Sequence, residues 1–203
     1  MENTQNNAKK RKKAHKQTVY NVIISLLILA LLVVIAFIVR KNYISYQNEE
    51  EIKEVLNTIK HEESLEGKTY EYKGYEVVGV IKIPKIDLEY PILGVTTQQS
   101  MKYSVTKFWG TEITELGNYT IAGHNNHNGT MFGKVKYLEN GDEIEVSDMK
   151  GNTVVYQVVG HYTTDPDDVS CIESIHPEKR ELTLITCTNG NKNRLITRAE
   201  EKE

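Results

Sequence analysis

A cysteine near the C-terminal end of the chain closes a strongly alternating segment. Residues 182–187 read Leu-Thr-Leu-Ile-Thr-Cys and lead into the turn-forming run Thr-Asn-Gly. Side chains of a β-strand alternate between two faces, so Cys187 shares a face with Thr183 and Ile185. A thiol at a strand end can reach a surface groove and, as a thiolate, attack a carbonyl carbon. Cys187 is therefore a candidate nucleophile.

Two arginines follow on the next apolar run, residues 194–198. The short connection makes this run a neighbouring strand, which brings the guanidinium of Arg194 near Cys187. Arg198 lies four residues later on the same strand face and is the competing candidate, farther from the thiol. A permanent cation can favour a thiolate, bind a peptide carbonyl or stabilise an oxyanion. Without further residues, a buried cysteine beside a solvated arginine is the better explanation of this pattern.

A histidine, His124, supplies the group that the pair lacks. The segment 118–129 ends a strand at the small residues Ala122 and Gly123, which leave space for a substrate chain, and delivers His124 into an Asn- and Gly-rich loop. A neutral imidazole there can act as acid or base. His127 fits a surface position. The spacing His124-x-x-His127 also suggests two zinc ligands, but no third ligand is near and the helical His-Glu-x-x-His context is missing.

A second cysteine, Cys171, leaves a disulfide with Cys187 as the competing interpretation. Such a bond would close a loop of about 15 residues and contribute roughly 3 kcal/mol. A domain of this length can fold without it, and the surroundings of Cys187 suit catalysis better.

The N-terminal part of the chain predicts a membrane anchor. Residues 22–39 are apolar apart from one serine, and 18 helical residues rise about 27 Å, near the hydrocarbon thickness of a bilayer. No small-residue cleavage site follows, which disfavours a removable signal peptide. Six Lys and Arg residues and one acid lie within residues 1–18, so the positive-inside rule places the N-terminus in the cytoplasm and everything after Lys41 outside. The net charge of the whole chain, -3, gives no basic field for nucleic acid.

The segments between the anchor and the alternating region predict a stalk. Apolar residues within 49–60 recur at helical spacing on one face, namely Ile52, Val55, Leu56 and Ile59. This helix could pack on the folded domain or extend it from the membrane. Residues 61–74 are polar and predict a linker of low order. The expected organisation is a basic tail over 1–18, an anchor over 19–39, a stalk and linker over 40–74, and a catalytic domain over 75–203.

The remainder of the chain predicts an all-β barrel or sandwich, because short alternating runs are separated by turn residues. The expected strands are 78–84, 118–122, 143–146, 153–159, 182–187 and 194–198. A single short helical turn is expected over 131–138.

The segments that carry these candidate residues resemble the sortases, cell-surface transpeptidases of Gram-positive bacteria. Thr-Leu-Ile-Thr-Cys at 183–187 matches the family's TLxTC signature, and Ile-Ala-Gly-His at 121–124 its histidine segment. Residues 193–198 are similar to the arginine strand that follows the cysteine, and 79–86 to the opening strand. The resemblance extends over about 75–198, in family order behind an anchor.

The resemblance implies an eight-stranded sortase-type β-barrel with short helices, preceded by one transmembrane helix. It implies Cys187 as nucleophile, His124 as proton-transfer residue and Arg194 as the clamp for substrate and oxyanion. We expect substrate contacts at Ala122, Gly123, Ile185 and Thr186. The implied donor is a surface protein with a Leu-Pro-x-Thr-Gly-like signal, cleaved between Thr and Gly. The implied acceptor is an amine of the cell-wall precursor, and residues 19–39 would contact membrane lipid.

Finer features favour a class A or class D sortase. The loop 163–180 is expected to set specificity and is too short for the helical insertion of class B; the lid motif of class C is missing. Some relatives bind calcium, and acids suited to that ion are present at Glu112, Glu115, Asp165, Asp167 and Asp168. They match only in part, so we expect no metal and no cofactor. A peptidase that only hydrolyses the signal, and a tethered binding module without activity, remain as alternatives.

Overall fold

The computed structural model describes residues 2–61 and 69–202, with side chains from residue 15 onward. One long helix, α1 (Glu2–His61), precedes a β domain. The chain divides into two compact units, residues 1–50 and 51–203, so the last turns of α1 belong to the same unit as the strands.

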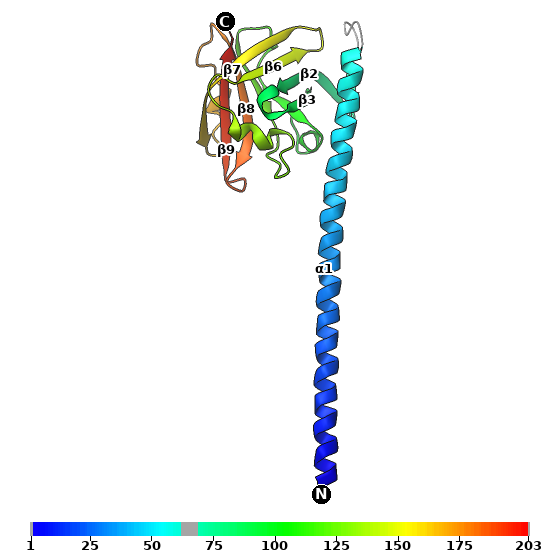
Figure 1. Cartoon of the computed structure of the whole chain (residues 1–203). Helices are drawn as coiled ribbons and strands as arrows, with labels where there is room; N and C mark the ends of the chain where they lie inside the picture. The colour runs from blue at the N-terminus through cyan, green and yellow to red at the C-terminus, as the bar shows by residue number, and fades with distance from the viewer. Residues whose placement is uncertain (1, 62–68, 203) are drawn as a thin grey trace. The chain divides into compact units, whose positions relative to one another are not determined.

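The strands of the second unit form one sheet in the order β1-β2-β3-β4-β5-β8-β9-β7-β6. Their bounds are β1 Tyr70–Tyr72, β2 Tyr75–Ile83, β3 Leu88–Leu93, β4 Val105–Trp109, β5 Gly117–Ala122, β6 Glu143–Asp148, β7 Thr153–Thr164, β8 Arg180–Thr188 and β9 Asn193–Glu201. Because β2 pairs with β6 as well as with β3, the eight strands β2–β9 close into a barrel (Figure 1). Strand β1 pairs with the first residues of β2, Tyr75 to Val77. The predicted eight-stranded barrel is confirmed.

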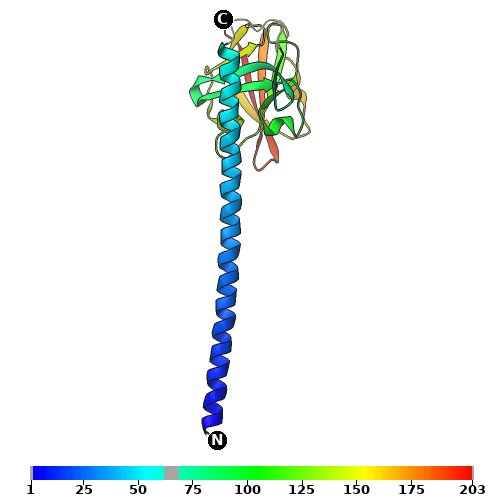
Figure 2. The ribbon, with the colours of Figure 1, turned by 90° about the vertical axis from the view of Figure 1, so that its right-hand side faces the viewer.

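Alternating apolar residues fill the barrel interior. Ile81, Ile92, Ile144 and Leu182 are fully buried members of one hydrophobic core. Figure 2 shows the backbone of the strands in a second view. Four short 3₁₀ helices connect strands, as η1 Pro84–Ile86, η2 Ser100–Lys102, η3 Phe132–Tyr137 and η4 Ser170–Ile172. The helical turn expected over 131–138 is η3.

The sequence-based strands correspond to β2, β5, β6, β7, β8 and β9, except that Pro84, expected to end the first strand, begins η1. Strands β1, β3 and β4 were not predicted. Strand β3 contains Pro91, which normally argues against a strand. The proline is tolerated because it pairs with Val80 of β2 on one side, while β4 pairs only with the next two residues on the other. Strand β1 lies in the segment expected to be a linker of low order, so that expectation is wrong for 70–72; residues 62–68 lie outside the described residues.

The end of α1 packs on the barrel, which decides between the two arrangements that the sequence left open. Ile52, Leu56 and Ile59 are buried members of the hydrophobic core. Polar contacts support this packing, since Lys60 pairs with Glu89 at 2.8 Å and Glu51 with Lys73 at 2.5 Å. The stalk helix is thus part of the folded unit from residue 51.

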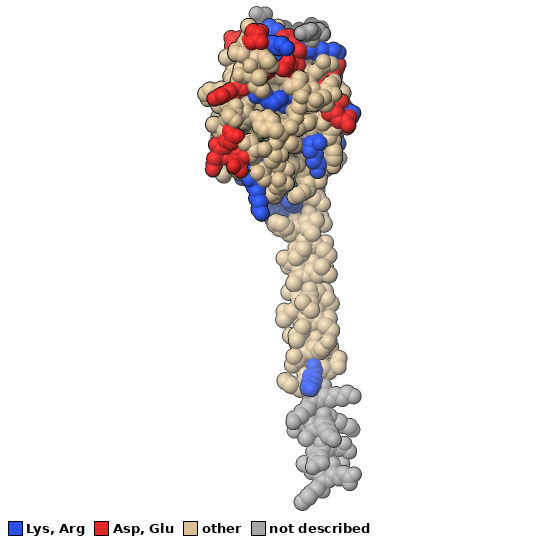
Figure 3. Space-filling view, turned by 90° about the vertical axis from the view of Figure 1, so that its left-hand side faces the viewer, with Lys and Arg blue, Asp and Glu red and all other residues tan. Residues whose placement is uncertain are grey.

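The first unit is a helix with an exposed apolar surface. The apolar side chains over 22–39 are all exposed, and Figure 3 shows a stretch of the helix without a charged side chain on the face in view. In the described part of the chain this is the one helix long and apolar enough to cross a membrane, judged by length and composition; an 18-residue window within it has a mean hydropathy of 3.5. It is a candidate transmembrane helix.

Candidate active site

The parallel pair β5 and β8 brings His124 and Cys187 to the same end of the barrel. Ala122 is opposite Ile185 in the register, so the residues that follow each of them lie side by side. Two hydrogen bonds continue the pairing beyond β5. The Gly123 N–H donates to the Ile185 carbonyl at 3.0 Å, and the Thr186 hydroxyl donates to the Gly123 carbonyl at 2.8 Å.

Further hydrogen bonds fix the loop that carries the histidine. The Asn125 side-chain amide donates to the Cys187 carbonyl at 2.7 Å, which ties this loop to the end of β8. The His124 carbonyl accepts from the Phe132 N–H at 3.0 Å. The imidazole itself is half-buried, and burial lowers the pKa of His124 below its ordinary value because the charged form loses hydration.

The antiparallel pair β8 and β9 places Arg194 directly opposite Cys187. The Arg194 guanidinium is half-buried and makes only long contacts, at 3.4 Å and 3.5 Å, to the backbone carbonyls of Asn193 and Asn191. Across the described ranges 2–61 and 69–202, no carboxylate forms an ion pair with it. Its donors can therefore bind an incoming carbonyl or oxyanion.

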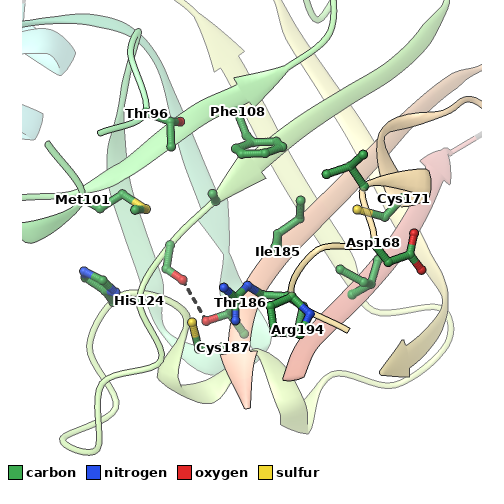
Figure 4. A pocket seen from close by; sticks show the side chains of 15 residues that line it. Thr96, Met101, Phe108, His124, Asp168, Cys171, Ile185, Thr186, Cys187 and Arg194 are labelled. Atoms are coloured by element: carbon green, nitrogen blue, oxygen red, sulfur yellow. Dashed lines mark hydrogen bonds between the residues drawn. The ribbon is translucent and has the colours of Figure 1, made fainter. Parts of the chain in front are cut away.

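These residues line one pocket of about 230 Å³. In Figure 4 the Cys187 sulfur lies between the His124 imidazole and the Arg194 guanidinium. The four residues expected to contact substrate line the same pocket, namely Ala122, Gly123, Ile185 and Thr186. An apolar pocket with a thiol, an imidazole and a guanidinium at one end can hold an extended peptide and attack one of its carbonyls.

Arg198, the competing clamp, lies elsewhere. Its side chain is only 7% exposed, does not line the pocket and pairs with Glu181 at 3.4 Å. It also donates to the Cys171 carbonyl at 2.8 Å and to the Thr183 hydroxyl at 2.9 Å. With these partners, the guanidinium of Arg198 is already engaged by the protein, whereas that of Arg194 faces the pocket.

The two cysteines are unpaired thiols at different places in the pocket. The Cys171 carbonyl lies 3.4 Å from the Thr183 hydroxyl. Thr183 precedes Cys187 by four residues of strand, or about 13 Å. A disulfide needs Cα atoms within about 7 Å, so pairing Cys171 with Cys187 would require the backbone to move. Burial raises the pKa of the Cys171 thiol, which lowers its reactivity.

The side chains that the sequence offered as metal ligands lie apart from one another or are bound to other protein groups. His127 is exposed and does not line the pocket. Glu112 pairs with Lys107 at 3.1 Å, and Asp168 accepts hydrogen bonds from Thr164 and the Ser170 N–H. Outside the masked segments, no three His, Cys, Asp or Glu side chains are grouped so that they could hold an ion.

Sequence reasoning did not single out the rest of the pocket wall. Strand β4 and the preceding segments contribute Thr96, Met101 and Phe108, and β9 contributes Ile196. The β7–β8 loop, residues 165–179, contributes Pro166, Asp168, Val169 and Cys171. The loop was expected to set specificity, which stays a prediction, and the structure shows that it lines the pocket. Its individual pocket residues were not expected, because they follow no periodic pattern.

Gly123 has a packing role that differs from the one expected. A Cβ there would lie 2.8 Å from the Phe132 ring and 2.9 Å from Val105. The glycine thus lets η3 pack closely behind the strand end, in addition to lining the pocket. The composition of the segment is consistent with this, but only the fold identifies which atoms come close.

Comparison with known proteins agrees with the fold and the site. Residues 81–202 match the family model of the sortase domain, and the chain belongs to the sortase family, whose members are cysteine transpeptidases. Sortase A of Bacillus anthracis is 33% identical over 119 residues, which are 58% of this chain and 55% of that protein. Sortase D of Bacillus subtilis (strain 168) is 33% identical over 110 residues, 54% of this chain and 53% of the relative. The chain spans about half the length of these curated relatives.

Solved structures show the same barrel. Sortase A from Corynebacterium diphtheriae superposes with a TM-score of 0.58 at 27% identity, covering 64% of this chain and 62% of that one. A Clostridium perfringens Sortase D5 transpeptidase gives a TM-score of 0.58 at 27% identity, covering 76% and 89%. The predicted family is therefore confirmed.

Proposed function

We propose that this chain is a membrane-anchored sortase that cleaves a sorting signal of surface proteins and joins the acyl part to an amine. The observation that carries the proposal is the meeting of Cys187, His124 and Arg194 in one pocket, at the ends of neighbouring strands. Each supplies a different function, so the arrangement fits acyl transfer better than a passive binding site.

Acylation begins when the Cys187 thiolate attacks the carbonyl carbon of the scissile peptide bond. The carbonyl oxygen becomes an oxyanion, and the Arg194 guanidinium stabilises it by charge and hydrogen bonds. Collapse of the intermediate breaks the C–N bond, and protonated His124 gives its proton to the departing amine. The products are a thioester on Cys187, a free amine and a neutral imidazole. The lowered pKa makes protonated His124 a stronger acid for this transfer.

Deacylation reverses these roles. An acceptor amine attacks the thioester carbonyl and gives a proton to neutral His124, while the C–S bond breaks and the Cys187 thiolate returns. Arg194 again stabilises the oxyanion. Nucleophile, acid–base group and charge are all side chains of this chain, so we propose that the reaction itself needs no metal or organic cofactor.

The substrates and location follow from the family and the sequence. The donor we propose is a surface protein with a Leu-Pro-x-Thr-Gly-like signal, and the acceptor an amine of the peptidoglycan precursor. The N-terminus is cytoplasmic and residues 19–39 span the membrane, which the basic cluster before that segment supports. The catalytic barrel then lies outside the cell.

The test uses the full chain in detergent micelles with a labelled Leu-Pro-x-Thr-Gly peptide, with and without an amine acceptor. We expect a thioester adduct on Cys187 in intact-mass spectra, and a peptide–amine product when acceptor is present. Cys187→Ala should show neither, and Cys171→Ala serves as the matched control that retains both. Equal turnover by Cys187→Ala would remove this residue from its role.

Two other outcomes identify the alternatives. Cleavage without any amine product, over a panel of signals and acceptors, would indicate a peptidase. Binding of the peptide without a thioester would indicate a tethered binding module. Loss of turnover in EDTA with recovery in calcium would show that the ion is needed after all.

A further inference from the structure

The β7–β8 loop is held by side chains of β5, β8 and β9, the three neighbouring strands that also carry or lead to the active-site residues. From β5, the Asn118 amide donates to the carbonyls of Cys171 and Ile172, at 3.0 Å each. From β9, Arg198 donates to the carbonyls of Cys171, at 2.8 Å, and Glu173, at 3.2 Å. The loop carbonyls thus meet donors that belong to the barrel.

Strand β8 supplies the complementary acceptor. The Glu181 carboxylate accepts from the Ser174 hydroxyl and from the N–H groups of Ile175, at 2.9 Å, and His176, at 3.2 Å. It pairs with Arg198 at 3.4 Å, and the Glu181 side chain is only 2% exposed. Carboxylate and guanidinium therefore bind opposite kinds of backbone group along residues 171–176.

The Thr183 hydroxyl joins the two halves. It donates to the Asn118 side-chain oxygen at 2.9 Å and accepts from Arg198 at 2.9 Å. We call Asn118, Glu181, Thr183 and Arg198 the loop anchor. Buried polar groups of this kind stabilise one conformation when all are satisfied and destabilise it when one partner is lost.

We propose that the loop anchor is a positioning device for substrate binding, which fixes the pocket wall formed by Pro166, Asp168, Val169 and Cys171. None of the anchor side chains lines the pocket, so their effect on substrate passes through the loop. The proposal rests on the proposed function for its kinetic part only, since the position of the loop can be measured without turnover.

The pocket wall formed by the β7–β8 loop is held by other contacts than the reacting groups Cys187, His124 and Arg194. Cys187 and Arg194 are paired in the β8–β9 register, and His124 follows β5, so strand pairing sets their positions. The anchor holds the opposite wall. Loosening it should therefore weaken substrate binding while the chemical step proceeds from the same three side chains.

The reactivity of the Cys171 thiol can report whether the loop wall is closed or open. It is 3% exposed, and its carbonyl is the group shared by Asn118 and Arg198. In a Cys187→Ala background it is the single remaining thiol, because the chain has two cysteines. Its rate of labelling by a thiol reagent under native conditions measures opening of the loop, and full chain in detergent micelles is used throughout.

The experiment compares Arg198→Met with Arg198→Lys and with Lys202→Met. Lys202 forms an exposed ion pair with Glu143 at 2.6 Å, is not a member of the loop anchor, and is the matched control. We expect Arg198→Met to speed Cys171 labelling at least about tenfold, corresponding to about 1.4 kcal/mol of opening free energy. Arg198→Lys, which keeps the charge but fewer donors, should be intermediate, and Lys202→Met should match the parent.

Kinetics on the same variants with Cys187 restored test the consequence. We expect Arg198→Met to raise KM for the signal peptide by about tenfold and to leave kcat within about threefold. Parent-like labelling with a parent-like KM would overturn the proposal, as would a fall in kcat alone. If the parent shows no turnover, the proposed function fails, while faster labelling would still establish the anchor.

A variant that does not fold is replaced by a milder one. Thr183→Val keeps the side-chain volume and leaves the Arg198–Glu181 pair in place, but removes the hydroxyl that joins the anchor. We expect the same pattern at smaller amplitude in both measurements. Unchanged labelling and unchanged KM in a folded Thr183→Val protein would contradict a joined anchor.

Discussion

Arg194 and Arg198 lie four residues apart on the same face of β9, yet their surroundings differ in almost every respect. Arg194 is opposite Cys187, half-buried, and makes only long contacts to two carbonyls. Arg198 is opposite Thr183, almost fully buried, and is paired with Glu181. The guanidinium of Arg194 is therefore available to a ligand, whereas that of Arg198 is bound within the folded domain. The comparison shows that residue type and strand face do not determine the role of an arginine; the segment that covers it does.

The largest expected effect is on stability, from Arg198→Met. Removing the guanidinium leaves the Glu181 carboxylate buried without its cation, and loss of one partner of such a pair costs about 3–5 kcal/mol. Urea unfolding in detergent, followed by fluorescence of the single tryptophan, Trp109, measures the free energy of unfolding of the barrel. Arg194→Met is the matched comparison and should stay within about 0.5 kcal/mol of the parent. Equal losses in the two variants would contradict the distinction.

The second expected effect is on the rate of acylation, which should depend on Arg194 and not on Arg198. Removing a donor that stabilises an oxyanion lowers the rate by about 10²–10³-fold. We therefore expect Arg194→Met to reduce the rate of acylation on that scale, in single-turnover experiments with the signal peptide, with the free energy of unfolding unchanged. Arg194→Lys should recover only part of the rate, since an ammonium lacks the planar fork of donors. A parent-like rate in Arg194→Met would exclude it as the clamp.

The sequence predicted the strand face of both arginines but not their partners. Alternation in 182–187 and 194–198 indicates which residues share a face, since that depends only on strand periodicity. The covering loop has no periodicity and is held by contacts between residues distant in the chain, such as Asn118 with Cys171. The acidic loop residues matched a calcium site only in part, and the sequence could not show which groups they contact. In the structure, Asp168 accepts hydrogen bonds from the Thr164 hydroxyl and the Ser170 N–H.

The barrel shows the same limit. Strands with an alternating pattern were predicted, but β3 contains Pro91 and β4 is short and partly polar, so neither has a clear pattern. Closure depends on the pairing of β2 with β6, which no local feature of either strand reveals. His124, Cys187 and Arg194 could be proposed together because short motifs carry them. The rest of the pocket lining could not, because it comes from separate parts of the chain: β4 and the residues before it, the β7–β8 loop, and β9.

The third expected effect is a partial recovery of the free energy of unfolding in a double variant. Replacing both members of a buried ion pair by uncharged groups is less damaging than replacing one, because no unpaired charge remains. We expect Arg198→Met combined with Glu181→Gln to be more stable than Arg198→Met alone by about 1–2 kcal/mol in the same urea measurement. Gln keeps an oxygen for the Ile175 N–H, but the loop carbonyls still lose Arg198. Strictly additive losses would show that the two side chains do not act as a pair.

The smallest expected effect is on the pKa of His124. It tests whether burial or the charge of Arg194 shifts this pKa. Burial lowers the pKa of His124 below 6.5, and no charged neighbour contributes to the shift. Proton NMR of the imidazole in Cys187→Ala should therefore give a value below 6.5, and Arg194→Met should leave it unchanged. Between the folded value and 6.5 the unfolded chain binds more protons, so this group's contribution to stability decreases as the pH falls through that window. His124→Gln should remove that part of the pH dependence. If the pKa of His124 rises in Arg194→Met, the shift is caused by the guanidinium of Arg194. Arg194 and Arg198 would then differ in their effect on neighbouring charges as well as in their burial.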